Sequence, residues 1–416
     1  MSSTYSTALA GLQANSQAIN VVSANLANLN TAGYKDNQVS FEDLVNQSLS
    51  GFSSNTSISG STVALANEQF TQGTLQTTGN PYDAAIQGGG FFVVQSPTGQ
   101  QLFTRTGDFS VDSSGHLVTS AGQYVEGWNA SGGVLNTTGA VSPIMLPTSL
   151  VQPPTATSNI SISANLDANA AVGSTDATFS SPIQVYDSNG TAHALTISYT
   201  ETAANTWSYS VTIPAADVSQ GASTTIASGT LTFDANGNMT SPNAAAGSIA
   251  LSTPSLADGA TMSASWNLYD ATGTPTITQY AQANANTATN QDGVPAGQLT
   301  NMQIGANGVV VASFTNGTNE NVAQIALASV FNPNSMQQLD GNAFAPTSAT
   351  SNPVIGLPST GARGSITGGS LETSTVDIAT EFTNLLQYER GYQANSKVIT
   401  TEDEVIQQTL SLIANS

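Results

Sequence analysis

The stretch NLLQYERGYQANSKVITTEDEVIQQTL, residues 384–410, differs from most of the chain because its apolar residues follow a helical repeat. One apolar residue falls at every seventh position: Leu371, Ile378, Leu385, Tyr392, Ile399, Ile406 and Ile413. A seven-residue repeat places these side chains in one stripe along an α-helix, and such a stripe is stable in water when another helix covers it. The sequence therefore predicts a long C-terminal helix that needs a partner.

The ends of this helix follow from capping patterns. Ser374-Thr-Val-Asp377 matches a capping box, so we expect a helix from Ser374 to Ile413, about 57 Å long at 1.5 Å per residue. A second capping box at 401–404 leaves open a break near Thr400. Gly391 lies inside the helix at a cost of about 1 kcal/mol relative to Ala. It is either a tolerated glycine or the mark of a closely approaching helix.

Residues 3–30 carry a matching stripe and are predicted to form the partner helix. Tyr5, Leu12, Ile19 and Leu26 share one heptad position, and Ala8, Asn15, Val22 and Leu29 lie three residues further on. The remaining face is uncharged Ser, Asn, Gln and Thr, so we expect this helix to be marginal on its own. The predicted assembly interface comprises Tyr5, Leu12, Ile19, Val22, Leu26, Leu29, Ile378, Phe382, Leu385, Tyr392, Ile399, Ile406 and Ile413.

Between the two helices, apolar and polar residues alternate and turn signals recur. Residues 181–213, SPIQVYDSNGTAHALTISYTETAANTWSYSVTI, contain three strand-like runs separated by turn residues, and 88–128 and 302–330 follow the same pattern. The fold class is therefore mainly β with long terminal α-helices. Because those helices come from opposite ends of the chain, we expect nested, discontinuous domains.

The domain boundaries are predicted from changes in composition. They give a helical domain of 1–30 and 374–416, a connector of 31–70 with 364–373, an inner β domain of 71–147 and 288–363, and an outer β domain of 148–287. The connector holds the Gly- and Ser-rich segment SLSGFSSNTSISGS, residues 48–61, and is expected to be compliant.

Composition excludes several kinds of partner. Only 7% of the 416 residues are charged, the net charge is -21, and no Lys or Arg occurs between Arg105 and Arg363. Nucleic acids and anionic membranes bind clustered Lys and Arg, so neither is expected as a partner. No cysteine is present, which excludes disulfides and Cys metal sites. We also expect no membrane insertion and, if the chain is exported, a route without a cleaved signal peptide.

No stretch matches an active site or a cofactor site. Three Asp-x-x-Gly segments beginning at Asp112, Asp187 and Asp234 could be pieces of calcium loops, but none continues to the distal Glu, so we read them as hairpin turns. The only histidines, His116 and His193, lie in hairpin contexts and are expected at the surface. We therefore predict no catalytic residue, no metal and no cofactor.

Both ends of the chain resemble known sequences. NVVSANLANLNTAGYK, residues 20–35, resembles the N-terminal signature of bacterial flagellar axial proteins, and residues 371–416 resemble the C-terminal signature of their rod and hook branch. Segments 103–128 and 326–344 are similar to flagellar hook proteins. Ser374-Thr-Val376 departs from the Ser-Asn-Val that is common in hook relatives. The residues that match the family motif are Asn25, Asn28, Thr31, Gly33, Tyr34, Gly391, Tyr392 and Asn395.

This resemblance implies a structural subunit of the flagellar hook, a flexible helical tube that acts as a universal joint between rod and filament. It implies export through the flagellar type III apparatus, an extracellular location in the basal body and hook, and a lumen that carries exported subunits. The implied partners are copies of the chain and the rod, hook-cap and hook-filament junction proteins. A distal rod protein or another axial sibling is the alternative, and a secreted surface protein or an enzyme is a remote one; the large middle piece favours the hook.

Overall fold

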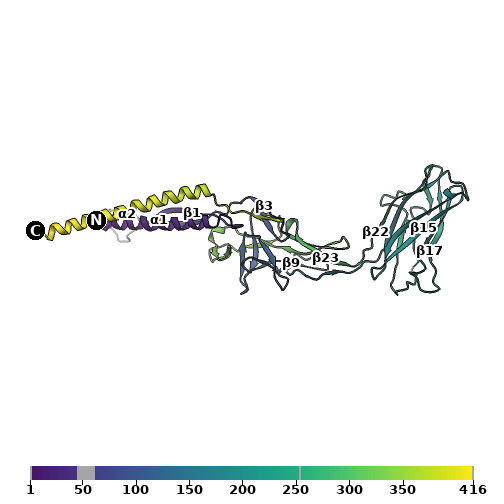
Figure 1. The fold of residues 1–416 in the computed structure, drawn as a ribbon, viewed down its shortest axis with the longest axis horizontal. Coiled ribbons are helices and arrows are strands. Elements are labelled where there is room, and N and C mark those ends of the chain that lie inside the picture. The colour runs from purple at the N-terminus through teal and green to yellow at the C-terminus, as the bar shows by residue number, and fades with distance from the viewer. Residues whose placement is uncertain (1, 45–60, 253, 415–416) are drawn as a thin grey trace. The chain divides into compact units, whose positions relative to one another are not determined.

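The computed structural model describes residues 2–44, 61–252 and 254–414, and the chain divides into two compact units (Figure 1). Unit 1 contains 1–148, 301–312 and 319–416, and unit 2 contains 149–300 and 313–318. Unit 1 is thus discontinuous and holds both terminal helices, whereas unit 2 is formed by strands. The prediction of a mainly β protein with paired terminal helices is confirmed. The four-part domain division is finer than these two units and stays a prediction.

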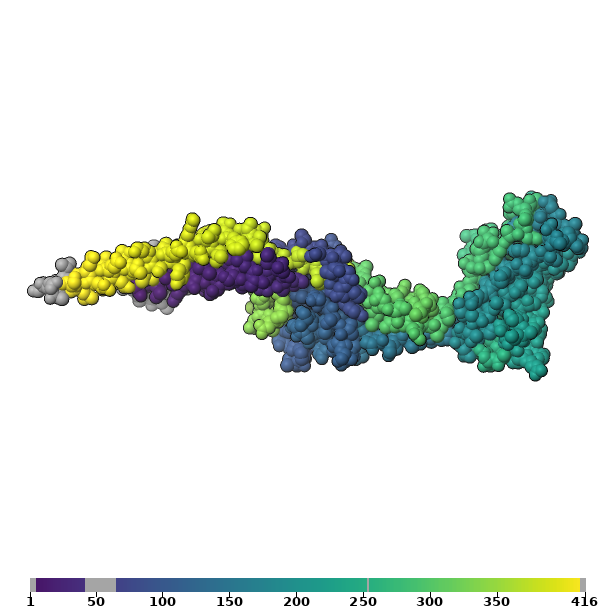
Figure 2. All heavy atoms as spheres, viewed as in Figure 1, coloured from purple at the N-terminus to yellow at the C-terminus, as the bar shows by residue number. Residues whose placement is uncertain are grey.

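Two helices, α1 (Ser2–Ala27) and α2 (Ile378–Ala414), lie side by side in unit 1, as Figure 2 shows for the purple and yellow segments. The expected start of α2 at Ser374 is wrong, because α2 begins four residues later, after Asp377. Its 37 residues run without a break past Thr400, and the hydroxyls of Thr400 and Thr401 donate to the carbonyl of Lys397 within the helix. Neither helix, over the residues described, is apolar enough to cross a membrane.

A β-hairpin packs against α1 where the sequence predicted a compliant connector. Strands β1 (Asn37–Leu44) and β2 (Ser61–Glu68) pair antiparallel from Asn37 with Glu68 to Leu44 with Ser61. Eight residues of each strand pair in regular register, and the compliance expected of 31–70 stays a prediction. Nearly all of the Gly- and Ser-rich segment 48–61 lies outside the described residues.

The remainder of unit 1 is a β structure around an aromatic core. Phe70, Phe91 and Phe344 pack edge to face, with ring centroids 5.4 to 5.9 Å apart. Strands β25, β9, β5, β6, β28 and β27 lie next to one another in that order. The strands of unit 1 are β3 (Leu75–Thr77), β4 (Ala84–Gln87), β5 (Phe91–Gln95), β6 (Gln101–Thr104), β7 (Phe109–Val111), β8 (Leu117–Thr119), β9 (Tyr124–Ser131), β10 (Val134–Leu135), β11 (Ser142–Pro143), β25 (Asn319–Ile325), β26 (Leu327–Ser329), β27 (Gln337–Leu339), β28 (Ala343–Ala345), β29 (Val354–Gly356), β30 (Ser365–Gly368) and β31 (Ser370–Glu372).

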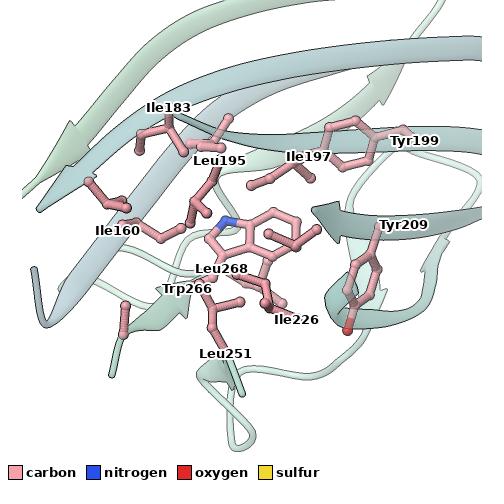
Figure 3. Close-up of a cluster of buried hydrophobic side chains, with 14 of the residues drawn as sticks. Ile160, Ile183, Leu195, Ile197, Tyr199, Tyr209, Ile226, Leu251, Trp266 and Leu268 are labelled. Carbon is pink, nitrogen blue, oxygen red and sulfur yellow. The ribbon is translucent and has the colours of Figure 1, made fainter. Parts of the chain in front are cut away.

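Unit 2 packs two sheets face to face over one core, with Trp266 at its centre beside Ile160, Leu195 and Ile197 (Figure 3). One sheet has the order β14-β15-β16-β17-β18, and the other combines β19, β20, β13, β21 and β22. The strands are β12 (Val151–Gln152), β13 (Asn159–Asp167), β14 (Thr178–Tyr186), β15 (Ala192–Ala203), β16 (Thr206–Thr212), β17 (Thr225–Phe233), β18 (Met239–Ser241), β19 (Ser248–Ala250), β20 (Ser265–Asn267), β21 (Ile277–Tyr280) and β22 (Ala285–Gln291); β23 (Gly297–Ile304) and β24 (Val309–Phe314) contribute residues to both units.

The Asp-x-x-Gly segments form hairpin turns, as predicted. In each, one carboxylate oxygen accepts the backbone N–H groups two and four residues further on, at 2.8 Å, for Asp112, Asp187 and Asp234. These hydrogen bonds hold the pKa of Asp112 and of Asp234 below the usual range. Asp270 closes a fourth turn in the same way.

The prediction of surface histidines is wrong for His193. Its ring is buried in unit 2, and its two nitrogens contact Asp217 at 2.9 Å and Asp187 at 3.2 Å. The carboxylates compensate for the burial of a ring that can carry a charge. His116 lies partly exposed beside Asp112.

Candidate assembly surface

The N-terminal motif residues gather where α1 turns into β1. Asn25 is fully buried and its Oδ1 accepts the backbone N–H of Asn37 at 3.0 Å and the hydroxyl of Tyr34 at 3.2 Å. Its Nδ2 donates to the carbonyl of Asn37 at 2.9 Å. The Thr31 hydroxyl donates to Asn28 Oδ1 at 3.0 Å within the intervening turn. One buried amide therefore joins the last turn of the helix to the first residue of the hairpin.

Gly33 lies at the point where this turn meets the β structure. Its φ of +70° is in the left-handed region, and a Cβ there would stand 2.7 Å from the backbone carbon of Arg105. Its N–H donates to the carbonyl of Glu372 at 2.8 Å. Both the conformation and the close backbone approach require glycine.

A buried ion cluster ties the same turn to the strand that precedes α2. Lys35 Nζ lies 2.6 Å from Glu372 Oε1, and Arg105 Nη1 lies 3.5 Å from Oε2. The side chains of Lys35 and Glu372 are fully buried. The N–H of Gly73 also donates to Glu372, at 2.7 Å, and Lys35 donates to the carbonyl of Thr71 at 2.6 Å. Four segments far apart in sequence meet at one carboxylate.

Burial sets the protonation of the groups around this cluster. It lowers the pKa of Lys35 and of Arg105, and the Glu372 carboxylate opposes both shifts. Burial also raises the pKa of Glu68, in β2, to about 7, although the charge of Lys35 works against it. Glu372 is thus the carboxylate that keeps two buried cations charged.

Thr375 fixes the segment that leads into α2. The Thr375 hydroxyl accepts the N–H of Asp36 at 2.9 Å and donates to Asp36 Oδ1 at 3.1 Å. Asp377 then caps the helix, because its Oδ1 accepts the N–H of Thr380 at 2.9 Å. That hydrogen bond is the main cause that lowers the pKa of Asp377. Thr375 therefore joins the segment before α2 to the residue that precedes β1.

Small residues allow α1 and α2 to approach closely. Ala8, Ala14, Ala18 and Val22 are buried along α1, which packs against both α2 and the hairpin. Cβ atoms built at Gly11 and Gly391 would come within 2.8 Å of Asn395 and 2.5 Å of Asn15, respectively, so the helices run antiparallel in close contact. The motif residues Gly391 and Asn395 belong to this contact between the helices. Sequence reasoning missed Gly11.

Most of the predicted apolar stripe is only partly covered in the single chain. Of its residues Val22 is buried, while Leu12, Ile19, Leu26, Leu29, Leu385 and Ile399 are half-buried. Tyr5, Ile378, Phe382, Tyr392 and Ile406 are exposed, and the side chain of Ile413 lies outside the described residues. Further exposed apolar side chains on the same elements are Leu9, Phe41, Leu65, Leu386, Val398, Val405 and Leu410. The outer faces of the helix pair and the hairpin thus present apolar surface to solvent.

Four family models match parts of this chain, including most of both terminal helices. Flagella basal body rod protein matches 6–35, and Flagellar hook protein FlgE/F/G D1 domain matches 85–165. Flagellar basal body protein FlaE D2 domain matches 155–294, and Flagellar basal body rod FlgEFG protein C-terminal matches 367–412. The helix pair and the strands are therefore those of a flagellar axial protein of the rod and hook class.

Relatives that match over nearly their full length show which family within this class the chain belongs to. The chain is 31% identical to Flagellar hook protein FlgE of Borreliella burgdorferi, with 99% of each chain covered, and 31% identical to that of Salmonella typhimurium, with 98% of this chain and 99% of the relative covered. The crystal structure of Helicobacter pylori flagellar hook protein FlgE2 has the same fold, with a TM-score of 0.51 and 18% identity over 72% of this chain and all of that one. The chain belongs to the flagellar hook protein family, a family of structural proteins and not of enzymes.

Proposed function

We propose that this chain is a hook subunit that polymerises into a helical tube through α1, α2 and the β1–β2 hairpin. The observation that carries the proposal is the apolar surface on those elements, which the pairing of the two helices leaves exposed. Five residues of the predicted assembly interface are exposed in the single chain, which supports the proposal: Tyr5, Ile378, Phe382, Tyr392 and Ile406. Copies of the same elements from neighbouring subunits would cover this surface.

Burial of this surface supplies the driving force. Each Å² of apolar surface removed from water contributes about 25 cal/mol, and many copies would be joined along each helix. Two long helices that are weakly stabilised on their own would gain most of their stability in the polymer. We propose that they become fully ordered on assembly.

Unit 2 gives the tube its compliance. Unit 2 has no Lys or Arg, and seven of its acidic residues are at least partly exposed: Asp167, Asp176, Asp217, Asp234, Asp258, Asp270 and Asp292. Like charges on neighbouring copies disfavour adhesion, so these units would slide over one another as the tube bends. This is the behaviour that a universal joint between rod and filament needs.

The specific partners follow from the same proposal. The tube would join the rod at one end and the hook-filament junction at the other, and would grow beneath a hook cap outside the cell. Subunits would reach it unfolded through the flagellar type III apparatus and the lumen. The uncharged outer face of α1 suits a surface that meets neighbouring subunits or passing chains.

Two kinds of deletion test the role of the helices in assembly and the role of unit 2 in flexibility separately. Chains that lack 1–30 or 376–416 are expected to stay folded and soluble but to form no tubes in electron micrographs. The matched control removes most of unit 2 by joining Thr155 to Val294, which form a β-bridge, so that 156–293 is lost. This variant should still form tubes, straighter and stiffer than those of the intact chain. Tubes from the helix-truncated chains, or none from the control, would contradict the proposal.

A further inference from the structure

A pocket of about 370 Å³ lies in unit 1 where the end of α1, the start of β1 and the first turns of α2 meet. Its lining includes Asp36, Asn37, Glu381 and Tyr388. Glu381 is only 6% exposed, and its Oε2 has no hydrogen-bond partner among the described residues. The pocket therefore presents a buried carboxylate oxygen that lacks a donor.

The charges around the pocket favour a cation. Asp36 and Glu381 both line it, and the nearest buried cations are already held by Glu372. Burial raises the pKa of Glu381, a hydrogen bond from Asn25 opposes this, and the charge of Asp36 adds to the rise. A buried carboxylate is stabilised when a charged donor reaches it, because unpaired burial of the charge is costly.

Only two of the chain's five cationic side chains remain available for a further ion pair. Of the five, Lys35 and Arg105 are paired inside unit 1, and the Arg363 guanidinium donates to carbonyl groups of its own loop. In the part of the chain that the structure describes, Arg390 and Lys397 have no ionic partner, and both are exposed on α2.

Arg390 cannot reach the pocket of its own chain. It lies nine residues beyond Glu381, which is about 13.5 Å along the helix and half a turn around it. It ends a ridge of residues spaced four apart, in which Ile378, Phe382 and Leu386 are 49%, 52% and 57% exposed. This ridge, three exposed apolar side chains with the Arg390 guanidinium at its end, is therefore left uncovered in the single chain.

We propose that Arg390 of one copy enters the pocket of a second copy and pairs there with Glu381 and Asp36. The ridge that leads to Arg390 would lie over the exposed edge of Phe41 and Tyr388, whose rings pack edge to face at 5.7 Å beside the pocket. The inference rests on the proposed function, since the polymer supplies the second copy. Arginine suits the site better than lysine because its planar fork can donate to two carboxylates and is more weakly hydrated.

Cysteine cross-linking tests this pairing, because the chain has no cysteine of its own. Chains with E381C and chains with R390C are mixed, polymerised and treated with a short bifunctional thiol cross-linker. We expect a cross-linked dimer in the tubes and none in the dilute subunits; a linker is needed because a paired Arg and Glu hold their Cβ atoms further apart than the roughly 3.8 Å of a direct disulfide. The matched control replaces R390C by K397C, the other free cation, and should give no dimer.

Charge reversal at Arg390, which is exposed and makes no ion pair among the described residues, gives a second readout. R390E should raise the protein concentration needed for tube formation about tenfold or more, whereas K397E should change it little. Equal cross-linking through both cysteines, or tubes from R390E at an unchanged concentration, would overturn the pairing and leave the proposed function intact. An unmodified chain that forms no tubes would instead contradict the proposed function, and the pairing with it.

Discussion

Gly391 of α2 lies so close to the side-chain amide of Asn15 of α1 that a Cβ at position 391 would stand 2.5 Å from Asn15 Oδ1. The contact is repeated with the helices exchanged, since a Cβ at Gly11 would stand 2.8 Å from Asn395 Nδ2. Asn15 Nδ2 donates to the carbonyl of Gly11 at 2.7 Å, which holds the amide in place. Of the two interpretations of Gly391, the structure supports close approach of a neighbouring helix.

Gly391→Ala is expected to destabilise the helix pair although alanine is the better helix former. Alanine gains about 1 kcal/mol in an isolated helix. Here it displaces the Asn15 amide, which loses a hydrogen bond worth about 1 kcal/mol and strains the contact. Because overpacking at such a contact costs about 1 to 3 kcal/mol, we expect a net loss of that size in the free energy of unfolding of the helices, measured by circular dichroism in urea.

A second variant should reverse the sign of this stability change. In the Asn15→Ala background the amide is gone, so Gly391→Ala should stabilise the helices by the propensity gain alone. An effect of Gly391→Ala that is the same in both backgrounds would show that the contact with Asn15 carries no energy.

Gly33→Ala should lower the free energy of unfolding of unit 1 by about 3 kcal/mol. About 1 kcal/mol comes from placing alanine in the left-handed region, and the remainder comes from the clash of its Cβ with the backbone of Arg105. Gly79→Ala is the control, because Gly79 has a φ of +77° but no atom within 4 Å of the added Cβ. That variant should lose only about 1 kcal/mol. Urea unfolding of both variants measures the difference, and equal losses would mean that the backbone at Arg105 can move aside.

Glu372→Gln removes the carboxylate that two buried cations share. We expect a loss of about 3 to 5 kcal/mol in the stability of unit 1, because Lys35 and Arg105 remain buried without a counter-charge. Lys35→Met should cost less, since Glu372 then still has Arg105 and the N–H of Gly73. If Lys35→Met proves as damaging as Glu372→Gln in the same urea titration, the carboxylate is not the centre of the cluster.

The fold class could be read from the sequence because local signals agreed with the tertiary structure. The heptad repeat gave two helices and the Asp-x-x-Gly turns gave hairpins, each from residues within a few positions of one another. A signal for the helix contact was also present: GLQAN at 11–15 and GYQAN at 391–395 carry glycine and asparagine four apart. Antiparallel pairing sets each glycine opposite the other asparagine.

Other features depend on contacts that no local pattern reveals. A heptad identifies a helix but not which of its faces meets its own partner, and here the small residues around Ala18 are covered while Ile378 and Phe382 are exposed. The ion cluster joins Lys35 to Glu372 across 337 positions. The start of α2 moved to Ile378 because Thr375 bonds to Asp36 and leaves the capping to Asp377.

The buried histidine of unit 2 makes the stability of that unit depend on pH. Burial alone would lower the pKa of His193, but hydrogen bonds and charges from Asp217 and Asp187 raise it above its ordinary value of 6.5. Asp258 faces the same cluster through Thr191 and Asp187. Because the folded pKa lies above the unfolded one, the protonated ring stabilises the folded state fully below pH 6.5, and this stabilisation is lost as the pH rises through the folded pKa.

Comparison with His193→Gln, which does not titrate, isolates this contribution. Thermal unfolding of unit 2 can be followed by the fluorescence of Trp207 and Trp266, which are fully buried in its core. The natural chain should exceed the variant in melting temperature by the largest margin near pH 6, and the margin should shrink steadily towards pH 9. A margin that stays constant or widens over this range would mean that His193 is neutral in the folded unit.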